Sequence, residues 1–324
     1  MMRKILVLHT GGTISMTADE NGAVAPSSTN PLLAAGMQLD NDIELEVEEI
    51  FNLPSPHVTP EKMLVLAKRI RRAQMAGVTG VVVTHGTDTL EETAYFLDLT
   101  LDPQIPVVVT GAMRSSNEIG TDGVYNFQSA IKVAASAGAR GKGCLVVMND
   151  EIHTARFVTK THTTNVATFR TPTFGPVGLV TKDGARFFQE LINQEACPID
   201  TVDANVVLIK AYAGMDGTLL GMLPDTVDGV VIEALGAGNM PPATLPAIKQ
   251  LLARHVPVVL VSRCFNGVAE PVYDYEGGGI PLQNAGVIFC QGLNGQKARI
   301  KLIVALSAGK TGEALAAYVN NAVS

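Results

Sequence analysis

Short runs of apolar, often β-branched residues alternate along this chain with segments in which apolar residues recur at helical spacing. In the first half, the runs at 4–9, 43–50, 80–84, 107–110 and 144–148 predict strands, and the periodic segments at 60–75, 88–99 and 122–135 predict helices. Unbroken valine runs at 81–83 and 107–109 are typical of strands covered on both faces. The alternation predicts an α/β fold with an open, mostly parallel sheet and helices on both faces.

The pattern changes after residue 181. Lys182-Asp183-Gly184 predicts a hairpin turn, and the polar stretch 189–205, which contains a proline and little periodicity, is interpreted as a linker. The alternation then resumes, with strands expected at 205–211, 229–233, 256–261 and 286–289 and helices at 243–255 and from 296 and 312. We therefore expect two such α/β domains, an N-terminal one over 1–188 and a C-terminal one over 206–324.

Composition narrows the class of protein. The 324 residues are 47% hydrophobic and 17% charged, which excludes a disordered chain. The net charge of −7, without a block of Lys or Arg, argues against nucleic acid as a partner. No apolar run reaches the roughly 18 residues of a membrane span, and the first apolar run, 5–8, is too short for a secretory signal. The four cysteines are far apart, without a CxxC pair, which fits a reducing cytoplasm. Cys144 and Cys290 lie in strand-like contexts, so we expect these two to be buried, inert thiols.

The turn directly after the first predicted strand carries the sequence HTGGTIS at 9–15. Its two glycines permit positive φ angles and leave backbone N–H groups free to face an anion or an oxyanion. Neither the dinucleotide fingerprint nor the phosphate-binding P-loop is present. The stretch is therefore either a plain turn or a ligand site at the carboxyl edge of the sheet, where it would present the hydroxyls of Thr10, Thr13 and Ser15.

The turn after the 80–84 strand carries the sequence THGTDT at 84–89. Asp88 could cap the following helix, or it could act with the hydroxyl of Thr87 on a small polar substrate. His85 could serve as a base, although a single histidine in such a turn is more often a structural hydrogen-bonding group.

A third polar cluster spans 150–164 and includes Lys160 within the sequence VTKT at 158–161. A threonine hydroxyl attacks a carbonyl only with the help of a base, and a neutral lysine amine can supply that help. The ordinary alternative is an exposed, solvated lysine. The residues alone favour the solvated lysine.

Taken together, TGGTI at 10–14, HGTDT with the following EETAYFLDLT at 85–100, and VTKT at 158–161 closely resemble the motifs of the bacterial L-asparaginase and glutaminase-asparaginase family. Similar stretches continue to QKAR at 296–299, so the resemblance covers nearly the whole chain. It implies hydrolysis of the side-chain amide of asparagine, and sometimes glutamine, to the acid and ammonia through a covalent acyl-enzyme. It also implies a homotetramer built as a dimer of dimers, and no metal or organic cofactor.

The resemblance assigns roles to individual residues. Thr13 corresponds to the nucleophile, and Thr87, Asp88 and Lys160 to a triad in which the lysine is the base. Asp88 also corresponds to the group that binds the substrate's α-ammonium. Two further substrate-binding residues are implied: the serine that holds the α-carboxylate, Ser55, and an asparagine that reaches a neighbouring subunit's site, Asn239. Which threonine attacks first, and whether asparagine or glutamine is preferred, stay open.

The chain departs from the family's pattern in three places. Pro56 stands where a glutamine often helps to bind the amino group, and a proline offers neither a side-chain donor nor a backbone N–H. The segment 16–26 lacks the family's loop tyrosine, and Ala23 or Val24 stands near its place. A length difference leaves three rivals for the glutamate that family members lend to an adjacent subunit, namely Tyr273, Asp274 and Glu276.

Two other functions compete with asparagine hydrolysis. An amidotransferase subunit that releases ammonia for tRNA-linked amidation contains a similar domain, but the acidic balance of this chain disfavours tRNA. A non-catalytic amino-acid sensor on the same fold would have no need of the lysine–threonine pair.

Overall fold

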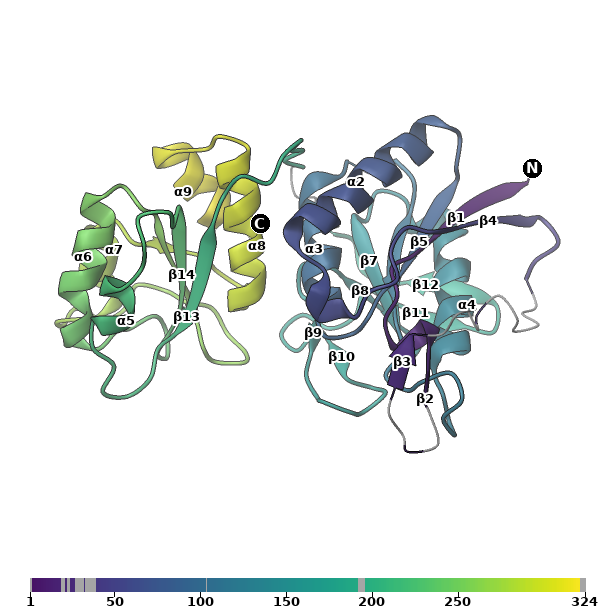
Figure 1. The fold of residues 1–324 in the computed structure, drawn as a ribbon, viewed down its shortest axis with the longest axis horizontal. Helices are drawn as coiled ribbons and strands as arrows, with labels where there is room; N and C mark the ends of the chain where they lie inside the picture. Colours follow the sequence, from purple (N-terminus) through teal and green to yellow (C-terminus); the bar gives the residue numbers. More distant parts are fainter. Residues whose placement is uncertain are drawn as a thin grey trace. The chain divides into compact units, whose positions relative to one another are not determined.

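The computed structural model describes residues 2–18, 21, 24–26, 32, 39–102, 104–191 and 196–320. The chain divides into two compact units, Met1–Ala196 and Cys197–Ser324, each built around its own sheet (Figure 1). The assignment of 189–205 as a linker stays a prediction. Among the described residues, no helix combines the length and the apolar character that a bilayer crossing requires.

The first unit contains an eight-stranded sheet in the order β12-β11-β8-β7-β6-β5-β1-β4. The strands are β1 (Arg3–His9), β4 (Ile43–Glu49), β5 (Gly80–Thr84), β6 (Val107–Thr110), β7 (Cys144–Met148), β8 (Glu151–Thr154), β11 (Gly178–Thr181) and β12 (Gly184–Phe187). The pairs from β4 through β7 are parallel, whereas β8, β11 and β12 join antiparallel at one edge. The predicted hairpin between β11 and β12 is confirmed, and β8 is a strand within the expected polar cluster.

Three helices cover the sheet of the first unit. They are α2 (Pro60–Met75), α3 (Leu90–Thr100) and α4 (Gly123–Ala134), and Figure 1 shows α2 and α3 on one face and α4 on the other. The residues of β5 and β6 are all buried, as the unbroken valine runs predict for strands covered on both sides. The predicted α/β architecture with helices on both faces is therefore confirmed.

Strand order explains where a site can form in this unit. From β1 the chain leads to β4, which pairs with one side of β1, and then to β5, which pairs with the other side. Such a reversal of strand order is the topological switch point, where ligands bind at the carboxyl ends of open parallel sheets. The turn of 10–15 and the turn of 85–89 leave the sheet at this point.

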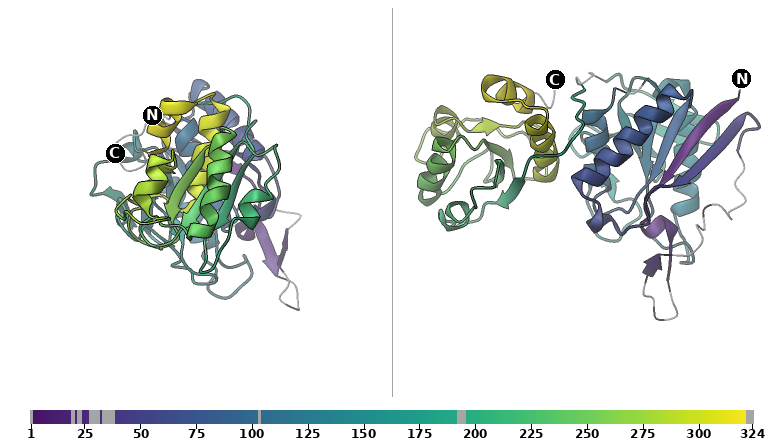
Figure 2. Two further views of the ribbon diagram at one scale, coloured as in Figure 1. Left: turned by 90° about the vertical axis from the view of Figure 1, so that its left-hand side faces the viewer. Right: turned by 45° about the horizontal axis from the view of Figure 1, so that its top comes forward.

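The second unit has a four-stranded parallel sheet in the order β13-β14-β15-β16. Its strands are β13 (Val206–Lys210), β14 (Gly229–Ala234), β15 (Val258–Ser262) and β16 (Ile288–Phe289). Its helices are α5 (Thr218–Gly221), α6 (Leu245–Ala253), α7 (Gly279–Asn284), α8 (Gly295–Ser307) and α9 (Gly312–Asn320). Figure 2 shows α8 and α9 on one side of this sheet and α5, α6 and α7 on the other. The helices α5 and α7 escaped prediction because four and six residues are too short to display a helical period.

Candidate active site

Two glycines after β1 allow the two turns of the switch point to meet backbone against backbone. Gly11 has a φ of 99° and Gly12 a φ of 84°, a left-handed region that disfavours residues with a Cβ. A Cβ at Gly12 would also overlap the backbone of Gly86, which lies in the turn after β5. Because Thr13 follows Gly12 and Thr87 follows Gly86, this contact places the two threonines on adjacent turns.

The three hydroxyl groups of the first turn differ in hydrogen bonding and in burial. The Thr10 hydroxyl donates to the Thr84 carbonyl at 2.9 Å and so ties the ends of β1 and β5 together. Ser15 is buried within a short 3₁₀ turn, Thr13–Ser15. Thr13 is partly exposed, and among the described residues its side chain makes no hydrogen bond. Of the three candidates, Thr13 is therefore the one that can face a ligand.

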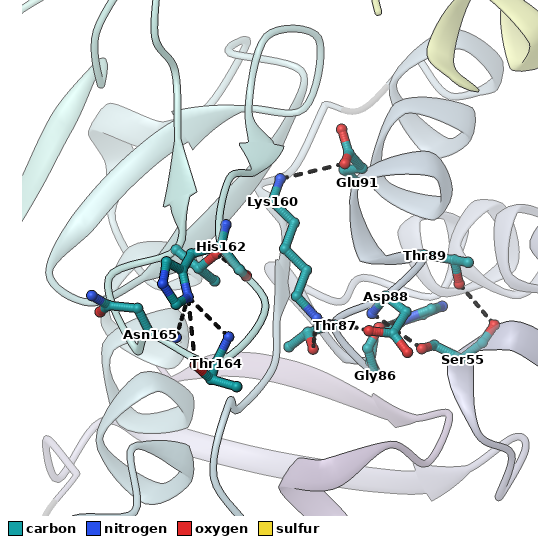
Figure 3. A network of polar contacts seen from close by, with 12 residues as sticks. Ser55, Gly86, Thr87, Asp88, Thr89, Glu91, Lys160, His162, Thr164 and Asn165 are labelled. Carbon is teal, nitrogen blue, oxygen red and sulfur yellow. Dashed lines mark hydrogen bonds and ion pairs between the residues drawn. The ribbon is translucent and has the colours of Figure 1, made fainter. Parts of the chain in front are cut away.

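Lys160 connects the second turn to the third polar cluster. Its Nζ donates to Thr87 Oγ1 at 3.0 Å and lies 2.7 Å from Asp88 Oδ1, across 72 residues of sequence or more (Figure 3). The Lys160 side chain is only 16% exposed, so the alternative of a solvated surface lysine is wrong. The Asp88 side chain, by contrast, is 62% exposed and remains accessible to a ligand.

Asp88 does not act as the cap of α3. The helix begins at Leu90, its N-cap position is Thr89, and no side chain makes a capping hydrogen bond there. The carboxylate instead pairs with Lys160, and the Asp88 backbone N–H donates to the Ser55 hydroxyl at 3.2 Å. Ser55, which is 5% exposed, also accepts the Thr89 hydroxyl on its carbonyl at 2.8 Å. The geometry thus joins Ser55 to the turn that carries Thr87 and Asp88.

His85 is a structural hydrogen-bonding group. It is completely buried, with Nδ1 at 2.7 Å from the Gly86 carbonyl and Nε2 at 2.9 Å from the Thr93 hydroxyl. Because a carbonyl only accepts, Nδ1 carries the proton and Nε2 accepts from Thr93. Burial lowers the pKa of His85 to about 4, and it does the same for His9 at the end of β1. The alternative of His85 as a base is disfavoured, because its Nε2 lone pair is already occupied.

Glu91, in the first turn of α3, was missed in the sequence. Its Oε1 accepts the Thr159 hydroxyl at 3.1 Å and the Lys160 backbone N–H at 3.3 Å, although Glu91 itself is buried. The available signal was a carboxylate at a position that the helical pattern turns toward the interior. A buried carboxylate needs partners, and the nearest candidate partners lay in the unconnected VTKT segment.

The remaining predicted residues belong to the second unit or to the 16–26 loop. Asn239 belongs to the second unit, where it forms an isolated bridge with Leu235 after β14. The three rivals for the family's inter-subunit glutamate are exposed in the same unit, after β15: Tyr273, Asp274 and Glu276. In the 16–26 loop, residues 19, 20, 22 and 23, and with them Ala23, lie outside the described residues.

The cysteines take no part in the candidate site. Cys144 and Cys290 are buried, and burial raises the pKa of both thiols, that of Cys290 to about 11. Buried thiols with raised pKa values are unreactive, as predicted for these two. Within the part of the chain that the structure describes, no three His, Cys, Asp or Glu residues are grouped so as to hold a metal ion.

Comparison with known proteins decides the family. The asparaginase N-terminal model matches residues 4–193, and the glutaminase/asparaginase C-terminal domain model matches residues 205–319. The chain belongs to the asparaginase family. The resemblance inferred from the motifs is therefore confirmed over both units, and the chain is placed among amidohydrolases.

Individual members of the asparaginase family are similar over almost their full length. An L-asparaginase of Bacillus licheniformis is 37% identical, with 96% of this chain and 98% of that protein aligned. A probable L-asparaginase of Deinococcus radiodurans is 40% identical, with 96% and 95% aligned. The crystal structure of a probable cytoplasmic L-asparaginase from Campylobacter jejuni superposes with a TM-score of 0.85 at 33% identity, covering 98% of this chain and 99% of that one.

Proposed function

We propose that this protein is an L-asparaginase that converts L-asparagine to L-aspartate and ammonia through a threonine acyl-enzyme. One observation carries the proposal: Lys160 Nζ is held between the Thr87 hydroxyl and the Asp88 carboxylate, beside the turn that bears Thr13. A hydroxyl within hydrogen-bond reach of an amine, which is oriented in turn by a carboxylate, is the arrangement of an activated nucleophile.

In the proposed reaction a threonine Oγ attacks the side-chain amide carbon of asparagine. Its proton passes to the basic group, the carbon–nitrogen bond breaks, and the nitrogen leaves as ammonia after accepting a proton. Water then attacks the ester and releases aspartate. Thr13 is our candidate for the attacking residue because its hydroxyl makes no hydrogen bond among the residues that the structure describes, while Thr87 and Lys160 supply the second hydroxyl and the base. The backbone N–H groups of the glycine turn are candidate oxyanion donors.

Substrate recognition follows from the same residues. Asp88 presents an exposed carboxylate for the α-ammonium, and Ser55, hydrogen-bonded to the Asp88 N–H, is proposed to hold the α-carboxylate. Asn239 is proposed to complete the site of a neighbouring subunit in a homotetramer built as a dimer of dimers. Pro56, which is exposed and has no N–H, adds nothing to ammonium binding. Part of that role is therefore expected from the partner, with Tyr273, Asp274 and Glu276 as the candidates.

Ammonia release from asparagine and from glutamine, measured at matched low concentrations, tests the proposed substrate. One methylene in a pocket is worth about 1–3 kcal/mol of discrimination, so a clear preference is measurable. The acyl-enzyme is tested separately with hydroxylamine, which competes with water for the ester and yields a hydroxamate. Ammonia release without any hydroxamate, at hydroxylamine concentrations high enough to compete, would contradict the covalent step.

Glutamine is the second candidate substrate. The second family model that matches this chain describes glutaminases as well as asparaginases, and glutamine presents the same amide one methylene further from the α-groups. A higher kcat/KM for glutamine would reverse the assignment. A cytoplasmic location is also proposed, supported by the structural relative with that description and by buried thiols that form no disulfide.

A further inference from the structure

Lys160 lies on a strand of only two residues. The strand β9 (Thr159–Lys160) pairs antiparallel with β10 (Phe169–Arg170), and the next residue, Thr161, donates its N–H to the Thr168 carbonyl at 2.8 Å. In an antiparallel ladder the backbone N–H and C=O groups of one residue point toward the partner strand, and those of the next residue point away from it. The Lys160 N–H therefore points away from β10. Pairing over only two residues does little to fix the position of β9.

Glu91 supplies the acceptor that this N–H requires. One oxygen, Oε1, accepts both the Lys160 N–H and the Thr159 hydroxyl, and the side chain that carries it is buried in the first turn of α3. An N–H without an acceptor destabilises the folded protein, and a carboxylate is a stronger acceptor than a neutral group. A negative charge is also favourable in the first turn of a helix. Glu91 therefore fastens β9 to α3.

Lys160 is consequently held at both of its ends by one segment of chain. Figure 3 shows its backbone end against Glu91 and its Nζ against Thr87 and Asp88. Glu91 follows Asp88 by only three residues, so the anchor and the two groups that the amine contacts lie in one short segment, which runs from the turn after β5 into the first turn of α3.

We propose that Glu91 is a positioning residue. It fixes the position of β9 against α3 and thereby places Lys160 Nζ within hydrogen-bond distance of the Thr87 hydroxyl. The inference rests on the proposed function, in which that amine is the base. Loss of the anchor leaves β9 free to shift, and a displacement of about 1 Å in a catalytic group can lower the rate about 100-fold.

The variants Glu91→Ala and Glu91→Gln test the proposal, with Glu92→Gln as the matched control for charge in the same helical turn. Glu91→Ala should lower kcat for ammonia release about 10- to 100-fold while KM changes less than about 3-fold, since Ser55 and Asp88 are untouched. Glu91→Gln keeps an acceptor oxygen and should recover kcat to within about 5-fold of wild type, and Glu92→Gln should stay within about 2-fold.

A double-mutant cycle with Thr159→Val provides a second test. This variant removes one of the two donors and should lower kcat by less than Glu91→Ala. The double variant, Glu91→Ala with Thr159→Val, should be no slower than Glu91→Ala alone, because loss of Glu91 already removes the hydrogen bond from the Thr159 hydroxyl. If Glu91→Ala does not fold, Thr159→Val and Glu91→Gln still carry the comparison. Losses that multiply, a Glu91→Gln enzyme as slow as Glu91→Ala, or a folded Glu91→Ala enzyme within 2-fold of wild type would overturn the proposal.

A structural readout separates this inference from the proposed function. If the wild-type protein releases ammonia from neither amide, the proposed function fails, but the anchoring can still be measured. A crystal structure of Glu91→Ala should show β9 displaced and the Nζ to Thr87 Oγ1 distance lengthened beyond the 3.0 Å of the native protein. An unchanged distance in that variant would show that Glu91 does not position Lys160.

Discussion

Gly12→Ala is expected to disable the candidate site while leaving the fold in place. The added Cβ has to enter the space that the Gly86 backbone occupies, and the residue also has to keep a φ of 84°. Non-bonded carbon atoms approach to about 3.5–4 Å, so the two turns must separate by on the order of 1 Å to admit the methyl group. Thr13 and Thr87 move apart with them. A shift of this size predicts a fall in kcat of about 100-fold or more.

Gly77→Ala is the matched control, because it imposes the same backbone strain without the collision. Gly77 follows α2 with a φ of 82°, and an added Cβ there would meet no atom within 4 Å. A residue with a Cβ in the left-handed region costs about 1–2 kcal/mol, which corresponds to a fall in Tm of roughly 2–8 °C in a unit of this size. Both variants should lose at least this much stability, and only Gly12→Ala should lose activity.

The assay is steady-state ammonia release from asparagine, paired with thermal unfolding of each variant. The reasoning makes kcat, rather than Tm, the quantity that distinguishes the two substitutions. A Gly12→Ala enzyme with kcat within about 3-fold of wild type would refute it. That result would mean that the backbone contact between the two turns does not set the geometry of the threonines.

Three further predictions follow from the same structure. Thr13→Ala and Thr87→Val should each lower kcat by about 1,000-fold or more with an unchanged circular dichroism spectrum, and near-native turnover in either would remove that residue from the mechanism. Lys160→Met should lose ammonia release to a similar degree, because the hydroxyl loses its base, and full activity would place the base elsewhere. His85 has a pKa of about 4 in the folded protein against 6.5 normally, so its contribution to stability is present above about pH 6.5 and is lost as the pH falls toward 4. His85→Asn should therefore weaken the pH dependence of the unfolding free energy over this range by up to about 3 kcal/mol, as measured by denaturant titration, and parallel curves for the two proteins would contradict the assignment.

The sequence predicted the strands and helices well where the hydrophobic pattern was long or uniform. The valines of β5 and β6 and the period of α2 identify their elements because burial on two faces, or on one helical stripe, leaves a repeating pattern. The antiparallel strand β8 was hidden because Ile152 is its only apolar residue, and its charged Glu151 bonds to Arg170. In a sequence, polar residues with such partners look like candidate functional residues rather than like part of a strand.

For the candidate site, the sequence predicted the turns but not the connections between them. A strand-end turn with glycines and threonines can be recognised from local pattern, and Thr87 and Asp88 lie in such a turn. Nothing local relates Lys160 to Thr87, because the pairing depends on how a segment 73 residues later folds back. The buried anchor at Glu91 was missed for the same reason, because its partners lie in that distant segment. A carboxylate in a first helical turn is, in addition, usually exposed.

The three motifs of this chain contain residues whose shape fits one another. Gly12 of the first motif lacks a side chain where Gly86 of the second approaches, so the two turns can touch. Glu91 of the second accepts from the strand that carries the third, and so Lys160 reaches Thr87. Neither Gly12 nor Glu91 contributes a side chain to the proposed reaction, yet each controls a distance between groups that do. The fit between the motifs, as much as the hydroxyl, amine and carboxylate groups themselves, therefore makes the proposed chemistry possible.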